Sequence, residues 1–89
     1  MSILTVSIRQ IKAARALLDW SQDDLASKSG ISIPAIKRLE ARDGFLGGSR
    51  KTSERIFATF EAAGVEFIEE NGSGPGVRLR KSKTKVPHE

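Results

Sequence analysis

Apolar residues recur every three or four positions through the first two thirds of the chain and then alternate with polar residues. The first spacing predicts amphipathic helices, and the alternation predicts strands. The first helix is expected to begin after Ser7, because the Ser7 hydroxyl and the Gln10 side chain can form a capping box. Its apolar face would carry Ile8, Ile11, Ala14 and Leu18.

Two short amphipathic helices joined by a tight corner are predicted next. Ser21 can cap the first of them, with Asp24 reaching back to the Ser21 amide, and Ser32 repeats this cap for the second. Pro34 falls in the first turn of the second helix, where its missing amide hydrogen has no intrahelical partner to lose. Gly30 suits the left-handed conformation that ends one helix and turns the chain. This spacing is typical of a helix-turn-helix, whose second helix reads DNA.

A fourth helix is expected over about residues 53–63, with Gly64 ending it. Residues 65–68 and 77–80 then predict two strands, separated by a loop of turn-forming residues, 71–76. A lone hairpin is only marginally stable in water. We therefore expect it to lie on the helices or to pair its edge with the same hairpin of a second subunit. The buried stripe of the fourth helix would comprise Ile56, Phe60 and Ala63, with Phe57 beside them. In the second strand, Val77 and Leu79 would face the packed side, and Arg78 and Arg80 the solvent.

The length and composition describe one small domain. The chain has 89 residues, 38% of them hydrophobic, so it buries a limited core and would gain stability from a partner subunit. It has no cysteine, and its one histidine is His88, which argues against disulfides, a metal site, a histidine-based triad or any cofactor. No apolar run is long enough for a membrane helix, and residues 3–6 are too short for a signal-peptide core. We expect a soluble, cytoplasmic protein.

The basic charge is concentrated near the end of the chain. The net charge is +4, which favours polyanionic partners. Between residues 77 and 88 there are basic residues and no acidic ones. This tail has two readings, a solvated disordered end or an arm that contacts phosphates. The basic residues concerned are Arg78, Arg80, Lys81, Lys83 and Lys85.

Enzymatic chemistry has little support in the sequence. The glycine-rich stretch 71–76 lacks the Lys-Ser/Thr of a phosphate loop and leads into a strand rather than a helix. The adjacent acids Asp23 and Asp24 point about 100° apart on a helix, so capping and helix-dipole stabilisation explain them better than catalysis. Glu69 and Glu70 form the other adjacent pair. We predict that the protein is not an enzyme.

A combination of residues in the two short helices carries a family resemblance: Gln22, Leu25, Ala26, Gly30, Ile31, Ser32, Ile36, Leu39 and Glu40. Over about residues 8–60, the chain resembles the Cro and phage-repressor type of helix-turn-helix, also called XRE-like. The resemblance implies a mainly α, lambda-repressor-like bundle of four to five helices with a C-terminal β-hairpin. Residues 1–64 would form the DNA-binding domain, 65–80 a hairpin that serves dimerisation, and 81–89 a basic disordered tail. The stretch from Ala62 to Arg80 also resembles the ending of small stand-alone bacterial regulators.

The resemblance assigns the base-reading positions to the start and outer face of the recognition helix. Among them, Arg38 can bond guanine O6 and N7 together, and its alternative role is a solvated surface arginine. Ile33 has no hydrogen-bonding side chain and could only pack, for instance on a thymine methyl group. The implied base contacts are Ser32, Ile33, Pro34, Lys37 and Arg38.

Backbone contacts and one salt bridge follow from the same resemblance. The implied phosphate contacts are Ser21, Gln22, Arg42, Arg50 and Lys51. Many relatives have a glycine where this chain has Arg42, which predicts that the third helix runs a little longer than in those relatives. Arg15 and Glu40 occupy positions that form a structural salt bridge in the family, and removing one partner of a buried pair costs several kcal/mol.

The function predicted from these residues and this resemblance is sequence-specific binding of double-stranded DNA by a homodimeric transcriptional regulator, a repressor of a nearby gene. Two copies would read an inverted-repeat operator with half-sites about 34 Å apart or a multiple of that distance. Two alternatives stay open: an antitoxin or accessory subunit that binds a protein partner and regulates its own gene, and a protein-interaction fold that has lost DNA reading. The latter would bind DNA weakly, steeply in salt and without sequence preference.

Overall fold

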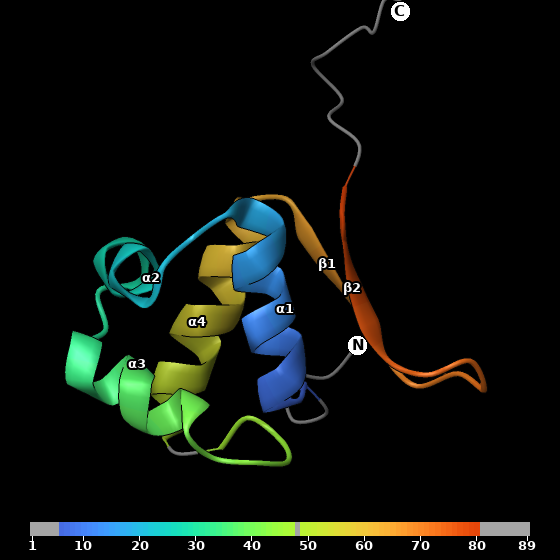
Figure 1. Ribbon diagram of the computed structural model, residues 1–89, viewed down its shortest axis with the longest axis horizontal. Helices are drawn as coiled ribbons and strands as arrows, with labels where there is room; N and C mark the ends of the chain where they lie inside the picture. Colours follow the sequence, from blue (N-terminus) through green and yellow to red (C-terminus); the bar gives the residue numbers. More distant parts are fainter. Residues whose placement is uncertain (1–5, 48, 81–89) are drawn as a thin grey trace, which may run out of the picture.

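Four helices and a two-stranded antiparallel sheet make up the described part of the chain, residues 6–47 and 49–80 (Figure 1), in this computed structural model. The mainly helical fold with a C-terminal hairpin is therefore confirmed. The predicted basic tail, residues 81–89, lies outside the described residues. The elements are α1 (Ile8–Leu18), α2 (Gln22–Ser29), α3 (Ile33–Glu40), α4 (Arg50–Ala62), β1 (Val65–Ile68) and β2 (Gly76–Leu79).

The predicted helix starts have the expected caps. Ser7 and Gln10 form a full capping box at α1, and Ser21 and Asp24 form another at α2. At α3, the Ser32 hydroxyl accepts a hydrogen bond from the backbone amide three residues later. Each cap satisfies amides that the helix itself leaves without a partner. Gly30 ends α2 with a φ of 77°, the left-handed conformation that the corner requires.

Two predicted elements have wrong boundaries. α4 begins at Arg50 rather than 53, because the Ser49 hydroxyl accepts the Thr52 amide and caps the helix earlier. α3 ends at Glu40, and its length compared with relatives stays a prediction. The second strand is shifted by one residue, to Gly76–Leu79, and Arg80 follows it. Ala63 likewise follows α4 instead of lying on its buried stripe, which comprises Ser53, Ile56 and Phe60.

The chain after α3 stops being helical because it pairs with the segment before α1. The Ile8 amide donates to the Gly44 carbonyl at 2.8 Å, and the Leu46 amide donates to the Val6 carbonyl at 2.7 Å. Gly44 has a φ of 83°, which lets the chain bend into this pairing. The loop is thereby fixed against the start of α1.

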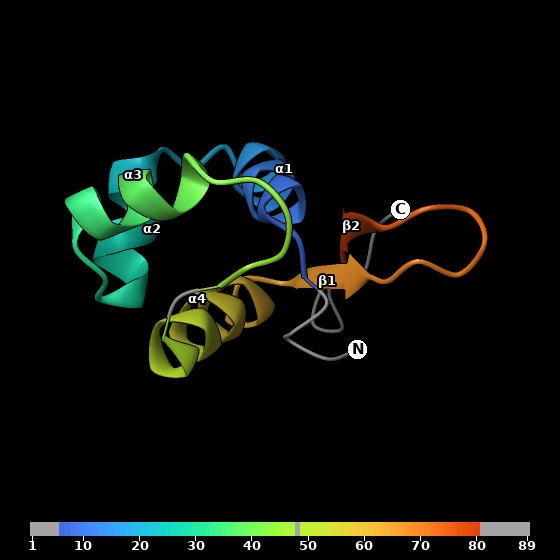
Figure 2. The ribbon, with the colours of Figure 1, turned by 90° about the horizontal axis from the view of Figure 1, so that it is seen from below.

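The hairpin packs onto the helices and shares their core. Figures 1 and 2 show β2 beside α1, and contacts link α1 to β2 and α4 to β1. Val65 and Phe67 belong to the same buried cluster as the helical residues. The Phe60 ring stacks on Trp20 and meets Phe67 edge-on. In the register, Val65 pairs with Leu79, Glu66 with Arg78, Phe67 with Val77, and Ile68 with Gly76.

Gln10 joins the start of α1 to both strands. Its side-chain nitrogen donates to the Ile68 carbonyl at 3.0 Å and to the Gly76 carbonyl at 2.9 Å, while its oxygen accepts the Ser7 amide. The residue is 4% exposed, so these bonds satisfy a buried polar group. The capping role was predicted from the sequence, but the bonds to the hairpin were not.

No helix within residues 6–47 and 49–80 combines the length and the apolar character that crossing a membrane requires.

Candidate nucleic-acid interface

α3 has one buried side and one exposed side. Ile36, Leu39 and Glu40 are buried against the rest of the domain. The five residues predicted to contact bases are all exposed on the other side or at the start of the helix: Ser32, Ile33, Pro34, Lys37 and Arg38. The helix therefore presents these side chains to solvent together.

The first turn of this exposed side offers few hydrogen-bonding groups. The Ser32 hydroxyl accepts the Ala35 amide at 3.2 Å and keeps its own proton free to donate. Ile33 is 37% exposed and Pro34 is exposed, and neither side chain can hydrogen-bond. Polar contacts to base edges from this helix therefore fall mainly to Ser32, Lys37 and Arg38.

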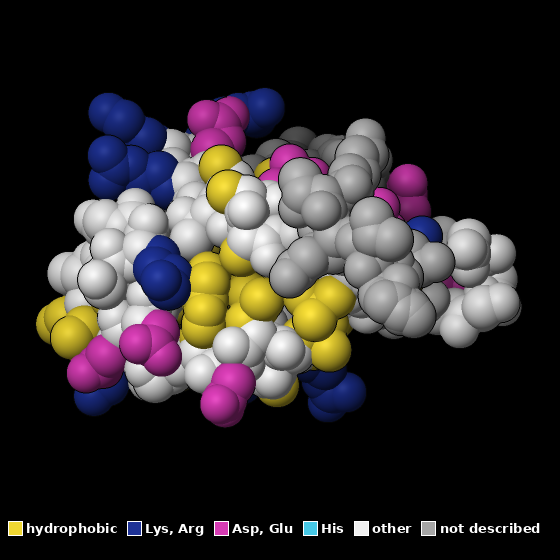
Figure 3. All heavy atoms as spheres, turned by 90° about the horizontal axis from the view of Figure 1, so that it is seen from above, with side chains coloured by type: hydrophobic (Ala, Val, Ile, Leu, Met, Phe, Trp, Pro, Cys, Tyr) yellow, Lys and Arg dark blue, Asp and Glu magenta, His cyan; other side chains and the backbone are white. Residues whose placement is uncertain are grey.

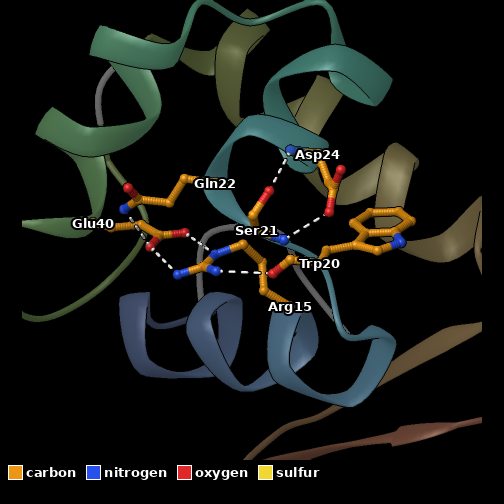
Figure 4. A network of polar contacts seen from close by, with 6 residues as sticks. All are labelled: Arg15, Trp20, Ser21, Gln22, Asp24 and Glu40. Atoms are coloured by element: carbon orange, nitrogen blue, oxygen red, sulfur yellow. Dashed lines mark hydrogen bonds and ion pairs between the residues drawn. The ribbon is translucent and has the colours of Figure 1, made fainter.

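A buried ion pair holds α3 against α1. Arg15 Nε donates to Glu40 Oε2 at 2.8 Å, and Arg15 Nη2 donates to Glu40 Oε1 at 2.7 Å (Figure 4). The Glu40 side chain is 2% exposed and that of Arg15 is 20% exposed. Arg15 Nη1 also donates to the Trp20 carbonyl at 3.0 Å, at the turn between α1 and α2. The pair thus has the two-point geometry that favours guanidinium and carboxylate groups.

Gln22 extends this network to α2. Its side-chain nitrogen donates to Glu40 Oε1 at 3.0 Å, as Figure 4 shows. Burial raises the pKa of Glu40, but hydrogen bonds from Arg15 and Gln22, together with the charges of Arg15 and Lys12, outweigh it and hold the pKa of this carboxyl below its ordinary value. Three helices therefore meet at one ionised carboxylate, which sets the position of α3.

The start of α2 combines an exposed cap with acidic neighbours. The Ser21 amide donates to Asp24 Oδ2 at 2.9 Å, and the Ser21 hydroxyl accepts the Asp24 amide at 3.0 Å. These bonds from Ser21 lower the pKa of Asp24. Ser21 is exposed, whereas Gln22 is half-buried and its side-chain amide is engaged with Glu40. Of the two predicted phosphate contacts here, Ser21 is the more accessible.

A cleft of about 150 Å³ separates the end of α3 from the start of α4. Arg38 and Arg42 line it from one side, and Ser49 and Thr52 line it from the other. Arg50 and Lys51 are exposed in the first turn of α4. Arg50 Nε bonds Glu54 at 3.1 Å, but both side chains are largely exposed, so this pair contributes little stability and can exchange for a phosphate.

The described residues hold no metal-binding cluster. Within 6–47 and 49–80, no three or more His, Cys, Asp or Glu side chains are grouped so that they could hold a metal ion.

A comparison with protein families bears on the role of these three helices. A family model described as helix-turn-helix matches residues 11–44. This match supports the similarity of residues 11–44 to the Cro/C1-type helix-turn-helix. A helix-turn-helix domain of this kind supports sequence-specific DNA binding by a protein of the transcription-regulator type. No curated protein matches the chain in sequence.

The matched helix-turn-helix contains α2, α3 and most of α1, and with them the whole Arg15–Glu40–Gln22 network. The sequence reading missed the bond from Gln22 to Glu40, whose partners are 18 residues apart. It also missed Arg9 and Lys12, which line a groove with Arg42. Arg9 and Lys12 are three residues apart, so they lie on one side of α1. This spacing is the feature of the sequence that could have indicated a shared basic surface.

Proposed function

We propose that the protein is a homodimeric transcriptional repressor that reads an inverted-repeat operator through α3. The observation that carries the proposal is the exposed side of α3, where Ser32, Lys37 and Arg38 stand free on a helix fixed from behind by Glu40. A helix that is already held in one orientation loses little conformational entropy when it binds base edges.

Selection from a pool of randomised duplexes tests this proposal. We expect enrichment of an inverted repeat whose half-site centres are about 10 base pairs, or 34 Å, apart or a multiple of that distance. A reporter gene placed behind the enriched sequence should fall in expression when the protein is supplied. Enrichment of no sequence would contradict the proposal, and enrichment of a single half-site would contradict its dimeric part.

Arg50 is proposed to contact a phosphate rather than a base. We expect Arg50→Ala to weaken binding to every duplex by a similar factor, and to reduce the slope of log K against log salt by about 0.9 for each bound subunit. Binding curves on the operator and on an unrelated duplex at several salt concentrations measure both effects. Arg55→Ala is the matched control, because Arg55 is also an exposed arginine on α4 but has no proposed contact with DNA. A changed sequence preference in Arg50→Ala would refute the assignment.

The proposed dimer surface lies where α1 runs beside β2. The bond from Gln10 to Gly76 brings the two elements together at one end. From Gln10 to Leu17 the helix axis rises about 10 Å. From Gly76 to Leu79 the strand also rises about 10 Å. The two leucines therefore lie at a similar level, and they are 42% and 47% exposed. Figure 3 shows hydrophobic side chains gathered around this end of α1.

A second copy suits this surface, since β2 is an edge strand in the described part of the chain and carries an exposed apolar side chain. We expect Leu79→Glu to convert the dimer to a monomer, because it would place two carboxylates in an apolar contact. Sedimentation equilibrium measures the mass. Phe45→Glu is the control, since Phe45 is 66% exposed in the loop after α3. Equal masses for Leu79→Glu and wild type would exclude this surface.

A further inference from the structure

A groove of about 550 Å³ runs between the first turn of α1 and the loop after α3. Arg9 and Lys12 line it from α1, and Arg42, Asp43 and Gly44 line it from the loop. The backbone bond from Ile8 to Gly44 ties the two walls together. The spacing of the charged groups is therefore set by ordered backbone on both sides.

This groove neighbours the cleft between α3 and α4, and Arg42 lines both. Figures 1 and 2 show the first turn of α1 and the last turn of α3 at the same end of the molecule. We call Arg9, Lys12, Arg42 and Arg38 the basic strip. All four are exposed, and among the ion pairs of the described residues none involves them.

The charges of the basic strip are poorly compensated. Asp43 is the one carboxylate among the residues that line the groove and the cleft. The charge of Lys12 also helps to lower the pKa of Glu40, the last residue of α3. Four cations next to a base-reading helix create a strong positive potential, and a double helix carries one negative charge per about 1.7 Å of its axis.

We propose that Arg9 and Lys12 extend the DNA interface onto α1, where the basic strip binds backbone phosphates beside the half-site that α3 reads. This inference rests on the proposed function, and it adds a surface that the predicted contacts do not include. The partner is the phosphodiester backbone of duplex DNA. Arg9, Lys12 and Arg42 supply affinity and register without base preference, since phosphate contacts carry no sequence information, while Arg38 keeps its base-reading role.

The test is the double variant Arg9→Gln with Lys12→Gln, measured against wild type over a range of salt concentrations. Each lost phosphate contact should reduce the slope of log K against log salt by about 0.9, so we expect a reduction of about 1.8 for each bound subunit, or about 3.6 for the homodimer. The preferred sequence should stay the same. Because both side chains are exposed, the thermal unfolding curve should also be unchanged.

The matched control is Lys28→Gln with Arg55→Gln, which removes the same charge from exposed positions on α2 and α4. We expect its salt slope to equal that of wild type. An unchanged slope in the Arg9 and Lys12 variant, or an equal reduction in the control, overturns the inference. The slope is measurable on any duplex, so the inference is tested even if wild type prefers no sequence, a result that would refute the proposed function alone.

Discussion

Glu40→Ala should lower the free energy of unfolding by about 3 kcal/mol, since removing one member of a buried ion pair leaves the other charge without its partner. Arg15 would lose both of its bonds to Glu40, and Gln22 would lose its acceptor. Urea unfolding followed by the fluorescence of Trp20, the one tryptophan in the chain, measures the loss. Glu54→Ala is the control, because its ion pair with Arg50 is exposed and worth about 1 kcal/mol or less. Equal losses in the two variants would contradict this account.

The same carboxyl makes stability depend on pH. The pKa of Glu40 is lower in the folded protein than in the unfolded chain, so folding favours its ionised form. Its contribution to stability is complete above the ordinary glutamate pKa of about 4.3, and it is lost as the pH falls through the lower, folded value. Glu40→Gln should therefore unfold with a flatter pH dependence than wild type in this acidic range. Parallel pH dependences would show that Glu40 does not contribute.

Arg38→Ala should cost about 1 to 3 kcal/mol of discrimination at one base pair, which is about 5-fold to 150-fold in relative affinity. The expectation follows from the exposed position of Arg38 on α3 and from the two-point fit of a guanidinium to guanine. Binding to the operator and to all its single-base substitutions measures the effect.

Arg42→Ala is the internal comparison for that measurement. Arg42 lies four residues further along and lines the same cleft, but it is proposed to contact phosphate. Its loss should weaken binding to every sequence while the preference is kept. If Arg38→Ala leaves the preferred sequence intact, Arg38 is a phosphate contact as well.

Local chemistry made the helix starts predictable, and long-range pairing made some boundaries unpredictable. The capping boxes at Ser7 and Ser21 involve residues three positions apart, so the sequence displays them directly. At α4, the expected start at about residue 53 was wrong. Ser53 proved to be buried within the helix, with its hydroxyl donating to the Gly47 carbonyl at 3.0 Å, while Ser49 is the cap. Which of these serines caps the helix depends on the path of the preceding loop. That path is fixed by backbone bonds to residues far away in sequence.

In the candidate site, too, some features follow from local sequence and others from long-range contacts. Exposure of Ser32, Lys37 and Arg38 follows from the helical period, which the sequence contains. The pairing of Arg15 with Glu40 came from family resemblance, because the two residues are 25 positions apart. The groove that joins Arg9 to Arg42 depends on backbone bonds between the start of α1 and the loop after α3, and no local pattern specifies those.

The side chain of Gln10 has a consequence for the order of synthesis. Its two acceptors in the hairpin lie 58 and 66 residues further along the chain. During translation, α1 is made long before either acceptor leaves the ribosome, so its buried carboxamide must wait for the hairpin to arrive. The native core is therefore completed only after Gly76 has emerged, and until then water must hydrogen-bond the Gln10 side chain.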